Sequence, residues 1–431
     1  MKTILLPEKG MWDELCIRPQ IERDNLESIV KAIINSVKSE GDNAIHSFSE
    51  KFDGISPVNL KVLPDEFLQS EKNISKDLKV AIRKAKANIE SFHSAQLTTE
   101  PVIETSGGVK CWRKSVAIEK VGLYIPGGSA PLFSTLLMLG IPAKLAGCKE
   151  IIVCTPPGKD GKINPLILYT AQLLGITEIY KAGGAQAIAA MAYGTESIPT
   201  VYKIFGPGNQ YVTKAKELVQ QDGIAIDMPA GPSEVLIIAD RLADPGFVAA
   251  DLLSQAEHGP DSQVLMLTDD KDFVEKVKYE VCQQLELLPR KEIASRSLEN
   301  SRLILLPSLY ACVEFSNLYA PEHLILNISD AGSFAEKIIN AGSVFIGKYS
   351  CESAGDYASG TNHTLPTNGY AKSYSGVSVD SFLKKISFQE INAAGLKDLG
   401  PVIELLAEAE SLTGHKNAVS IRLKSLKNDR S

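Results

Sequence analysis

The stretch VGLYIPGGSAPLFSTLLMLGIPAKLAGCKEIIVCT, residues 121–155, decides the fold class of this chain. It starts with a short apolar run, passes through a loop rich in Gly and Pro, continues as a long helical pattern and ends in a second apolar run. A helix between two short buried strands is typical of a parallel pair joined by a crossover. The segment is therefore predicted to be one strand–helix–strand unit of an α/β protein.

The same alternation continues along the chain in two series. The first also contains IYKAGG from Ile179 and YKIFG from Tyr202, and a helical pattern follows each of them. The second series has five apolar runs, which start at Val235, Val264, Leu303, Leu324 and Val344. The first hundred residues and the segment after about Val379 read mainly as helix. We therefore expect mostly parallel sheets with helical crossovers and a helical C-terminal end.

Length and composition fit a soluble protein with two major α/β domains. A chain of 431 residues is too long to fold around one small core. Its contents of 44% hydrophobic and 23% charged residues are ordinary for a globular protein. A net charge of −7 argues against nucleic-acid and anionic-membrane partners. No secretory signal or membrane-spanning run is predicted. Seven cysteines without a Cys-x-x-Cys pair predict reduced thiols and a cytoplasmic location.

Three Gly-rich loops each follow a predicted strand and precede a predicted helix: IPGGSAP from Ile125, AGGAQA from Ala182 and FGPGNQY from Phe205. Backbone N–H groups at such positions can hold a phosphate. None of the loops is the G-x-G-x-x-G fingerprint, and a tight turn at the sheet end explains each loop alone equally well. Together they favour a nucleotide-sized ligand. The polar side chains placed to reach it are Tyr124, Gln186 and Asn209.

Four of the six histidines lie in polar stretches of the second half: His258, His323, His363 and His415. Imidazole moves protons near neutral pH and binds zinc. Gln255 and His258 are three residues apart on a predicted helix, so both side chains can face one ligand. The alternative for His258 is an exposed histidine that interacts with the helix C-terminus.

Asp356 lies in a stretch rich in Gly and Ser, where a turn-forming aspartate is the alternative. His415 follows a helical pattern beside Lys416, where the alternative is an exposed surface residue. Together Gln255, His258, Asp356 and His415 would make a plausible nitrogen and oxygen set for Zn²⁺, with room for a nitrogen-bearing substrate. Their spacing is not local, so the pattern alone does not join them.

Glu322 and His323 are adjacent after Pro321. Neighbours in a regular strand face opposite sides, so both serve one site only if they lie on the turn that enters the strand. They would then supply a general base and a carboxylate that activates water. The alternative is a solvated pair at a strand start. His46 and His93, among charged helical neighbours, are predicted to be surface residues.

Eight motifs in colinear order, spanning roughly residues 115–420, resemble the histidinol dehydrogenase family. They are VGLYIPGGSAPLFSTLLM from Val121, GGAQAIAA from Gly183, FGPGN from Phe205, DMPAGPSEV from Asp227, LSQAEHGPDSQV from Leu253, PEHL from Pro321, SAGDYASGTNHTLPT from Ser353 and GHKNAV from Gly414. These enzymes catalyse the last two steps of histidine biosynthesis. The first hundred residues carry little of this signature, so their assignment rests on length and helical pattern.

The resemblance implies a four-electron oxidation of L-histidinol, through bound L-histidinal, to L-histidine, with NAD as the oxidant and one Zn²⁺ per subunit. By motif, the zinc ligands are Gln255, His258, Asp356 and His415. His323 matches the general base and Glu322 the residue that activates water, while the zinc positions the substrate. The substrate contacts would be Ser233, Gln255, His258, His323, Asp356, Glu410, His415 and His363. The NAD contacts match Tyr124, Gln186 and Asn209.

The resemblance also implies two incomplete Rossmann-like domains with small N- and C-terminal helical tails. The expected boundaries are 1–22 for an N-terminal arm, 23–122 with 233–377 for a first large domain that carries the zinc and catalytic residues, 123–232 for a second large, NAD-contacting domain, and 378–431 for the C-terminal helical tail. An intertwined homodimer is expected, in which this tail reaches the partner's active site. Glu410 and His415 would then complete the neighbour's site.

The residues leave two other functions open. A zinc-dependent hydrolase could use the same ligands with Glu322 activating water, although the chain lacks H-E-x-x-H. A two-domain binding protein for small molecules is also built from two α/β lobes. The adjacent Glu322 and His323 count against a binding role alone.

Overall fold

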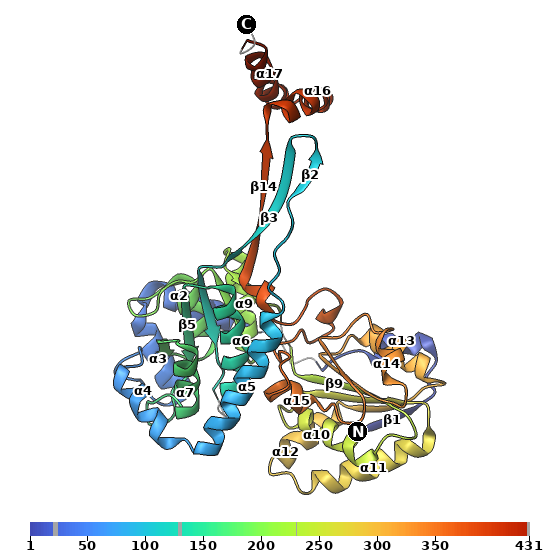
Figure 1. The fold of residues 1–431 in the computed structure, drawn as a ribbon. Helices are drawn as coiled ribbons and strands as arrows, with labels where there is room; N and C mark the ends of the chain where they lie inside the picture. The colour runs from blue at the N-terminus through green and yellow to red at the C-terminus, as the bar shows by residue number, and fades with distance from the viewer. Residues whose placement is uncertain (20–24, 128–131, 230, 429–431) are drawn as a thin grey trace. The chain divides into compact units, whose positions relative to one another are not determined.

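The computed structural model describes residues 1–19, 25–127, 132–229 and 231–428. The chain divides into two compact units: Met1–Gln96 with Ile118–Phe382, and Leu97–Ala117 with Leu383–Ser431. The first unit contains a six-stranded and a five-stranded sheet, both parallel throughout, with helices between successive strands (Figure 1). The predicted α/β class with mostly parallel sheets is confirmed.

The six-stranded sheet has the order β1-β11-β10-β9-β12-β13. Its strands are β1 (Lys2–Leu5), β9 (Glu234–Ala239), β10 (Gln263–Thr268), β11 (Arg302–Leu305), β12 (His323–Asn327) and β13 (Ser343–Ile346). The five apolar runs of the second series form the five later strands, as predicted. The strand β1 was not expected, because Lys2–Leu5 was assigned to an N-terminal arm; it pairs with β11 at the sheet edge.

Helices cover both faces of this sheet, because alternate strand residues point to opposite sides. One face packs against α10 (Pro245–Ala256), α11 (Lys271–Leu285) and α12 (Lys291–Glu299). The other face packs against α1 (Trp12–Leu15), α13 (Leu309–Tyr319) and α14 (Ala331–Ala335). Two further short helices of this unit are α15 (Glu352–Tyr357) and the 3-10 turn η1 (Lys9–Met11).

The five-stranded sheet has the order β6-β5-β4-β7-β8. Its strands are β4 (Lys120–Tyr124), β5 (Glu150–Thr155), β6 (Glu178–Lys181), β7 (Lys203–Phe205) and β8 (Ala225–Ile226). The opening stretch of the sequence analysis therefore forms β4 and β5 with a helix between them, as predicted. Its loop residues 128–131, which are part of IPGGSAP, lie outside the described residues.

Helices also cover both faces of the five-stranded sheet. One core contains α5 (Lys76–Ser94), α6 (Phe133–Ala146) and α7 (Pro165–Leu174), and α4 (Pro64–Ser70) packs on α7. The other contains α2 (Leu26–Glu40), α3 (Asp42–Asp53), α8 (Gly184–Tyr193) and α9 (Gln210–Gln221). The remaining 3-10 turns are η2 (Glu71–Asn73), η3 (Tyr370–Lys372) and η4 (Val379–Phe382).

The N-terminal helices pack against the five-stranded sheet, whereas the expected domain boundaries grouped them with the six-stranded sheet. Residues 23–122 were grouped with 233–377, yet the apolar faces of α2 and α5 bury against the five-stranded sheet. Lys61 also forms an antiparallel bridge with Tyr180 at the edge of that sheet. The helical pattern correctly identified these elements, but an amphipathic face does not specify which of two sheets it covers.

The second unit contains a three-stranded antiparallel sheet, β14-β3-β2, and two helices. Its elements are β2 (Ile103–Ser106), β3 (Val109–Ala117), β14 (Leu383–Ile391), α16 (Ala393–Ala409) and α17 (Thr413–Asn428). The prediction of an entirely helical tail over 378–431 is wrong for Leu383–Ile391. That strand is almost wholly exposed, so only the alternation of Ile386 and Phe388 marked it.

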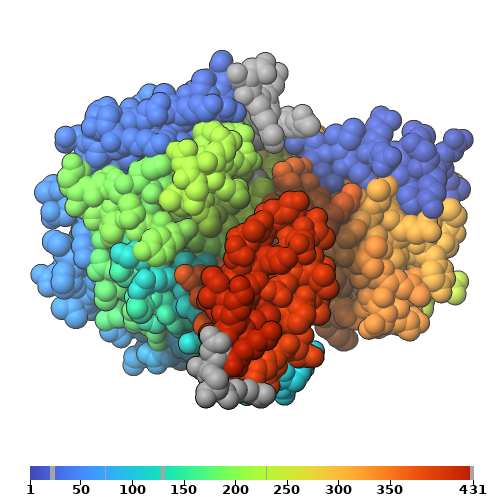
Figure 2. Space-filling view, turned by 90° about the horizontal axis from the view of Figure 1, so that it is seen from above, coloured from blue at the N-terminus to red at the C-terminus, as the bar shows by residue number. Residues whose placement is uncertain are grey.

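The helices of the second unit carry exposed apolar side chains. Leu405, Leu406 and Ile421 are 68%, 63% and 66% exposed in the single chain. The pair α16 and α17, coloured red, faces the viewer in Figure 2. Among the described residues, no helix combines the length and apolar composition that crossing a membrane requires.

Candidate functional site

Glu322 and His323 lie where β12 begins, at the amino end of the six-stranded sheet. His323 is the first residue of β12 and is only 3% exposed, and Glu322 is 7% exposed. The chain turns sharply before them, because Ala320 has a φ of 55°. Oε2 of Glu322 lies 3.6 Å from Nδ1 of His323. The two side chains are buried and adjacent, so the pair is not solvated; that both serve one site stays a prediction.

The hydrogen bonds of His323 define which ring nitrogen is free. Nδ1 lies 3.1 Å from the backbone carbonyl of Glu234, the first residue of β9. A carbonyl only accepts, so Nδ1 carries the hydrogen and donates it. Nε2 lies 3.5 Å from Oδ1 of Asp356 and has no hydrogen-bond partner among the described residues. Nε2 is therefore the ring nitrogen that is not committed to the backbone, and it faces Asp356.

Acidic neighbours control the pKa of His323. Burial by itself lowers this pKa, but the carboxylates of Glu352, Glu322 and Asp356 raise it by more. The result is a pKa well above the ordinary value for histidine. An imidazole in this setting is a proton carrier whose basicity depends on the charge of the carboxylates around it.

Gln255 joins Glu322 and His323 to the end of α10. Its Nε2 donates to the Glu234 carbonyl at 3.2 Å and to Oε2 of Glu322 at 3.4 Å. Oε2 of Glu322 also accepts from the backbone N–H of Glu234 at 2.8 Å. Gln255 is 1% exposed, and its Oε1 has no partner among the described residues. The amide is thus fixed by its nitrogen and presents an unused oxygen, as a metal ligand would.

Three further side chains could hold a cation. Ligand atoms of His258, Glu352 and Asp356 lie within 4.8 Å of one another. His258 follows α10 and is exposed, while Glu352 and Asp356 are on α15. Oε2 of Glu352 and Oδ1 of Asp356 are buried without hydrogen-bond partners in the described part of the chain. Buried carboxylate oxygens need a compensating partner, so the donor set fits a divalent cation.

The structure therefore brings together two of the four predicted zinc ligands, His258 and Asp356. Gln255 contacts Glu322 and His323, and His323 in turn lies beside Asp356. The structure places Asp356 on a short helix, not in the turn that was the alternative. Glu352 was missed. The only feature in the sequence that could have found it is its spacing of four residues from Asp356, which puts two carboxylates on one helical face.

The carboxyl groups of this cluster have opposite pKa shifts. Burial, together with Asp356 and Glu322, raises the pKa of Glu352 well above its usual value, although His323 opposes this. Burial would also raise the pKa of Asp356, but His323, His363 and His258 lower it by more. Asp251, one helical turn before Gln255, has a pKa raised to about 7 by burial. Burial thus favours the protonated form of Glu352, whereas the nearby histidines favour the ionised form of Asp356.

His363 connects the two sheets of the first unit. Its Nδ1 lies 2.9 Å from the backbone carbonyl of Asp356, and its Nε2 lies 3.1 Å from Oγ1 of Thr135. Thr135 is in the first turn of α6, at the carboxyl end of the five-stranded sheet. Burial lowers the pKa of His363, which favours the neutral ring. His363 thus contacts the first turn of α6, beside the five-stranded sheet. It also contacts the backbone of α15, the helix that carries Glu352 and Asp356.

Glu234 and Arg18 support Glu322 and His323, and sequence reasoning missed both. Arg18 binds the 1%-exposed Glu234 through Nε at 3.0 Å and Nη2 at 3.1 Å. The guanidinium also stacks 3.6 Å from the ring centroid of Tyr319. The Glu234 backbone contacts Glu322, Gln255 and His323, so this ion pair fixes the strand end that orients all three. Ser233, half-buried, immediately precedes this strand end.

The Gly-rich loops lie at the carboxyl ends of the five-stranded sheet, where ligands of α/β sheets bind. Tyr124 ends β4, and its hydroxyl accepts from the N–H of Gly184 at 3.0 Å. Gln186, in α8, is 1% exposed with no partner for Oε1 among the described residues. Asn209 caps α9 through Oδ1, which accepts from Tyr211 and Val212, so only its amide nitrogen is free to reach a ligand.

A buried ion pair holds the FGPGN loop in shape. Lys216 on α9 pairs with Asp227, and both side chains are almost fully buried. Nζ of Lys216 donates to the Gly206 carbonyl at 3.0 Å, while Oδ2 of Asp227 accepts from the Gly206 N–H at 2.8 Å. Gly206 has a φ of 128°, and a Cβ there would lie 2.1 Å from the Tyr124 carbonyl oxygen. The shape of the loop is therefore fixed, and only glycine can occupy position 206.

Two further predicted residues, Glu410 and His415, belong to the second unit. Glu410 is at the C-terminal end of α16, and His415 is in the first turn of α17. Both are exposed and belong to the second unit, so their role in a shared site stays a prediction.

His93, predicted to be a surface residue, is fully buried: Nδ1 contacts the Ile89 carbonyl at 2.8 Å, and Nε2 lies 3.3 Å from Nδ2 of Asn362. Charged neighbours on the exposed face of α5 concealed its inward position.

The cysteines behave as predicted. All seven are free, and Cys148 and Cys154 are buried as small apolar residues. Burial raises the pKa of the Cys148 thiol to about 11 and raises that of Cys154 further. Neither thiol is activated as a nucleophile.

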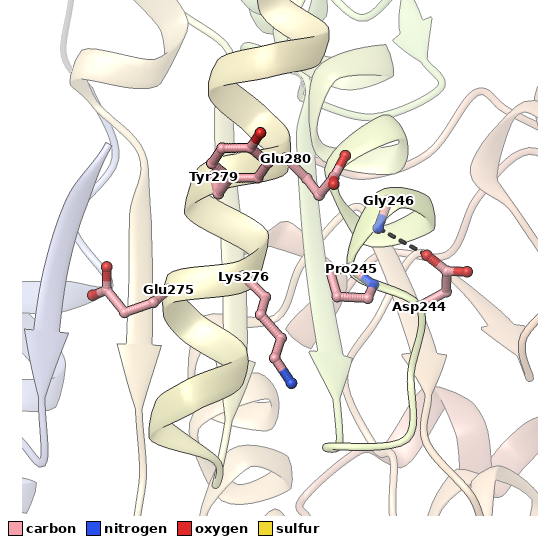
Figure 3. Close-up of a pocket in the computed structure, with 7 residues that line it drawn as sticks. All are labelled: Asp244, Pro245, Gly246, Glu275, Lys276, Tyr279 and Glu280. Carbon is pink, nitrogen blue, oxygen red and sulfur yellow. Dashed lines mark hydrogen bonds between the residues drawn. The ribbon is translucent and has the colours of Figure 1, made fainter.

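A separate hollow of about 600 Å³ lies at the opposite end of α10 from Gln255 (Figure 3). It is lined by Asp244, Pro245, Gly246, Glu275, Lys276, Tyr279 and Glu280. Oδ1 of Asp244 accepts from the Gly246 N–H at 2.9 Å, which is an ordinary helix cap. None of these lining residues has a buried polar atom without a partner, so the hollow is not a second candidate site.

Comparisons with known proteins agree on one family. The family model described as histidinol dehydrogenase matches residues 16–423. Histidinol dehydrogenase of Bacteroides thetaiotaomicron is 58% identical over 99% of this chain and 100% of its own length. The chloroplastic histidinol dehydrogenase of Arabidopsis thaliana is 52% identical over 99% of this chain and 92% of its own. The crystal structure of histidinol dehydrogenase from Elizabethkingia anophelis superimposes with a TM-score of 0.97, at 57% identity over 99% of both chains.

Proposed function

Because the chain belongs to the histidinol dehydrogenase family, it is an oxidoreductase of histidine biosynthesis that acts on histidinol, and we propose the following mechanism for it. The enzyme oxidises L-histidinol in two successive steps, first to bound L-histidinal and then to L-histidine, with two NAD⁺ reduced. The amino end of the six-stranded sheet holds the substrate, and the carboxyl end of the five-stranded sheet holds NAD.

His323 is the general base of both oxidations. Its Nδ1 hydrogen is committed to the Glu234 carbonyl, so Nε2 takes the hydroxyl proton as the carbinol hydrogen leaves. After the aldehyde is hydrated, Nε2 takes the proton of the hydrate in the same way. The ion pair of Arg18 and Glu234 keeps the ring in position through the strand end that it stabilises.

Glu322 activates water against the aldehyde. Its Oε2 accepts from the Glu234 N–H and the Gln255 amide, whereas no hydrogen bond to Oε1 is formed among the described residues. The bonded oxygen fixes the carboxylate, and the other is left to remove a proton from water. His323 lies directly beside it, so the same imidazole, once it has passed its first proton to water, can receive the next proton.

Gln255, His258 and Asp356 would hold a zinc ion, with His415 of a second chain as the fourth ligand. Support comes from the unpartnered oxygens of Gln255 and Asp356 and from the mixed nitrogen and oxygen donor set. When bound, zinc supplies a fixed positive charge for the substrate's imidazole and amino nitrogens, and NAD⁺ supplies the hydride acceptor. Carboxylates paired with a cation raise the His323 pKa less, which makes Nε2 a better base for neutral pH.

Tyr124, Gln186 and Asn209 would bind NAD. A dinucleotide at the carboxyl end of the five-stranded sheet is supported by three features: the fixed loop at Gly206, the buried free oxygen of Gln186 and the helix start at Asn209. His363 and Thr135 mark where the two ligands would meet. Ser233 and Glu410 would contact the substrate, the latter from the partner chain.

A homodimer with shared active sites follows from this assignment. Its support is the exposed apolar surface of α16 and α17, which a second chain would cover. The seven free thiols favour a reducing compartment such as the cytoplasm. The charge of −7 gives no reason to expect nucleic acid as a partner.

One observation carries the mechanism: Glu322, His323, Gln255 and Asp356 converge at the amino end of the six-stranded sheet. The test is to supply purified, zinc-loaded protein with L-histidinol and NAD⁺ and to follow NADH by absorbance and histidine by chromatography. Two NADH per histidine are expected. Histidinol binding without NADH formation would support a binding protein, and zinc-dependent hydrolysis without NADH would support a hydrolase.

A further inference from the structure

Glu352 is a buried carboxyl group to which the proposed mechanism gives no role. It is the first residue of α15, its side chain is 1% exposed, and Oε2 has no hydrogen-bond partner among the described residues. A carboxylate without a partner in such a place is costly unless a cation or proton compensates it. Its position therefore needs an explanation beyond packing.

The surroundings of Glu352 are those of a metal ligand. Its oxygen lies with the ligand atoms of His258 and Asp356 in a group whose members are all within 4.8 Å of one another. Donors at about 2.0–2.2 Å from a tetrahedral zinc ion are roughly 3.3–3.6 Å apart, so a side-chain adjustment on the order of 1 Å closes the group around one ion. His258 is exposed, which leaves a route for the ion from solvent.

We propose that Glu352 is a metal ligand and that His258, Glu352 and Asp356 form a loading site for zinc within a single chain. This inference rests on the proposed zinc site. All three residues belong to one compact unit, whereas His415 belongs to the other unit. The first unit thus holds the ion with one nitrogen and two carboxylate oxygens before His415 of a partner chain completes the final set.

This arrangement explains why an extra carboxylate is kept beside a complete set of ligands. Two carboxylates neutralise the ion's charge without help from a second chain, and Gln255, which is neutral, cannot do so. Glu352 and Asp356 are four residues apart on one helix, so the same turn of α15 presents both. The ion can be captured by one chain and then shared with the partner's His415.

The test measures Zn²⁺ binding to full-length protein by equilibrium dialysis and metal analysis, together with the visible spectrum of the Co²⁺ form. The variants are Glu352→Gln, His415→Ala and the double variant. Asp53→Asn is the matched control, because Asp53 also has a buried, unpartnered carboxylate oxygen but lies on α3. Glu352→Asp keeps the charge and withdraws the oxygens by one methylene.

We expect Glu352→Gln to weaken zinc binding about 10- to 100-fold, the usual range when groups that support a metal site are removed. His415→Ala should still bind one zinc per chain, and the double variant should lose that binding and the tetrahedral Co²⁺ spectrum. Glu352→Asp should weaken binding in a folded protein, and Asp53→Asn should bind like the wild type. Equal affinity of Glu352→Gln and wild type, or of the double variant and His415→Ala, would overturn the inference and leave the proposed function intact. A wild type that binds no zinc would overturn both.

Discussion

Nε2 of His323 lies 3.5 Å from Oδ1 of Asp356, and neither atom has a hydrogen-bond partner in the described part of the chain. The proposed base and a proposed metal ligand therefore lie side by side. In the proposed mechanism, this relationship would put the substrate hydroxyl beside Nε2, the imidazole nitrogen that is not committed to the backbone. It also gives a physical reason for proton removal and substrate positioning to occur at one point.

Replacing His323 with Asn should remove the base and leave binding in place. Asn can still donate to the Glu234 carbonyl as Nδ1 does, but it has no basic nitrogen at the position of Nε2. We expect kcat to fall about 10²- to 10⁴-fold, the usual contribution of a general base. Zinc content and histidinol affinity, measured by metal analysis and calorimetry, should remain close to those of the wild type. His46→Asn, on α3, is the control; wild-type turnover in His323→Asn would exclude the base role.

Replacing Glu322 with Gln should impair aldehyde oxidation more than alcohol oxidation. The amide oxygen can still accept from the Glu234 N–H, so the fold of the strand end is kept. Only the aldehyde step consumes water, and a neutral amide cannot activate it. Single-turnover measurements with histidinol and with histidinal, each followed by NADH formation, separate the two steps. Equal rate losses in both would contradict the assignment.

Replacing Gly206 with Ala should damage the NAD loop. A Cβ at this position meets the Tyr124 carbonyl oxygen at 2.1 Å, and the φ of 128° is unfavourable for any other residue. We expect a lower free energy of unfolding, by roughly 1–3 kcal/mol, and a markedly raised KM for NAD⁺. Urea unfolding and initial rates measure the two effects. Gly332→Ala, whose Cβ would meet nothing within 4 Å, should change neither; an unaltered KM in Gly206→Ala would refute the loop's role.

Replacing His93 with Gln should reduce the loss of stability in acid. Burial lowers the pKa of His93 from 6.5, so below that pH the unfolded chain binds more protons than the folded chain. The neutral ring's contribution is fully present above pH 6.5 and is lost as the pH falls through 6.5 towards the lowered value. Urea unfolding at about pH 7.5 and about pH 5.5 should show a smaller drop in His93→Gln, whose side chain does not titrate, than in wild type. An equal drop in both would show that His93 does not titrate in this range.

Mixing two inactive variants should restore activity if the sites are shared. In a heterodimer of His323→Ala and His415→Ala chains, one site carries both lesions and the other carries neither. Random assortment makes about half of the dimers mixed, so roughly a quarter of wild-type activity is expected. Refolding the chains together and measuring NADH formation tests this. Heterodimers isolated with two different affinity tags that stay inactive would mean that each site belongs to one chain.

Local patterns predicted most of the fold, because each needs only a few neighbouring residues. Apolar runs bounded by Gly and Pro predicted β4, β5 and the five later strands of the six-stranded sheet. The patterns missed β14, since a strand exposed on both sides has no buried face to mark it. They also misplaced His93, because α5 has more charged residues on its exposed face than buried residues on its inward face, and the charged residues dominate the local pattern.

The chain's sequence alone determined its family, its α/β class and the identity of Glu322, His323, Gln255, His258 and Asp356 as residues of interest, since these depend on residue type and order. Only the tertiary structure decided that they meet at the amino end of the six-stranded sheet and that Glu352 lies among them. It also decided that His363 reaches Thr135 of the other sheet. The physical reason is that packing of two sheets and their helices brings together side chains far apart in the sequence, and no local periodicity records which buried faces come into contact.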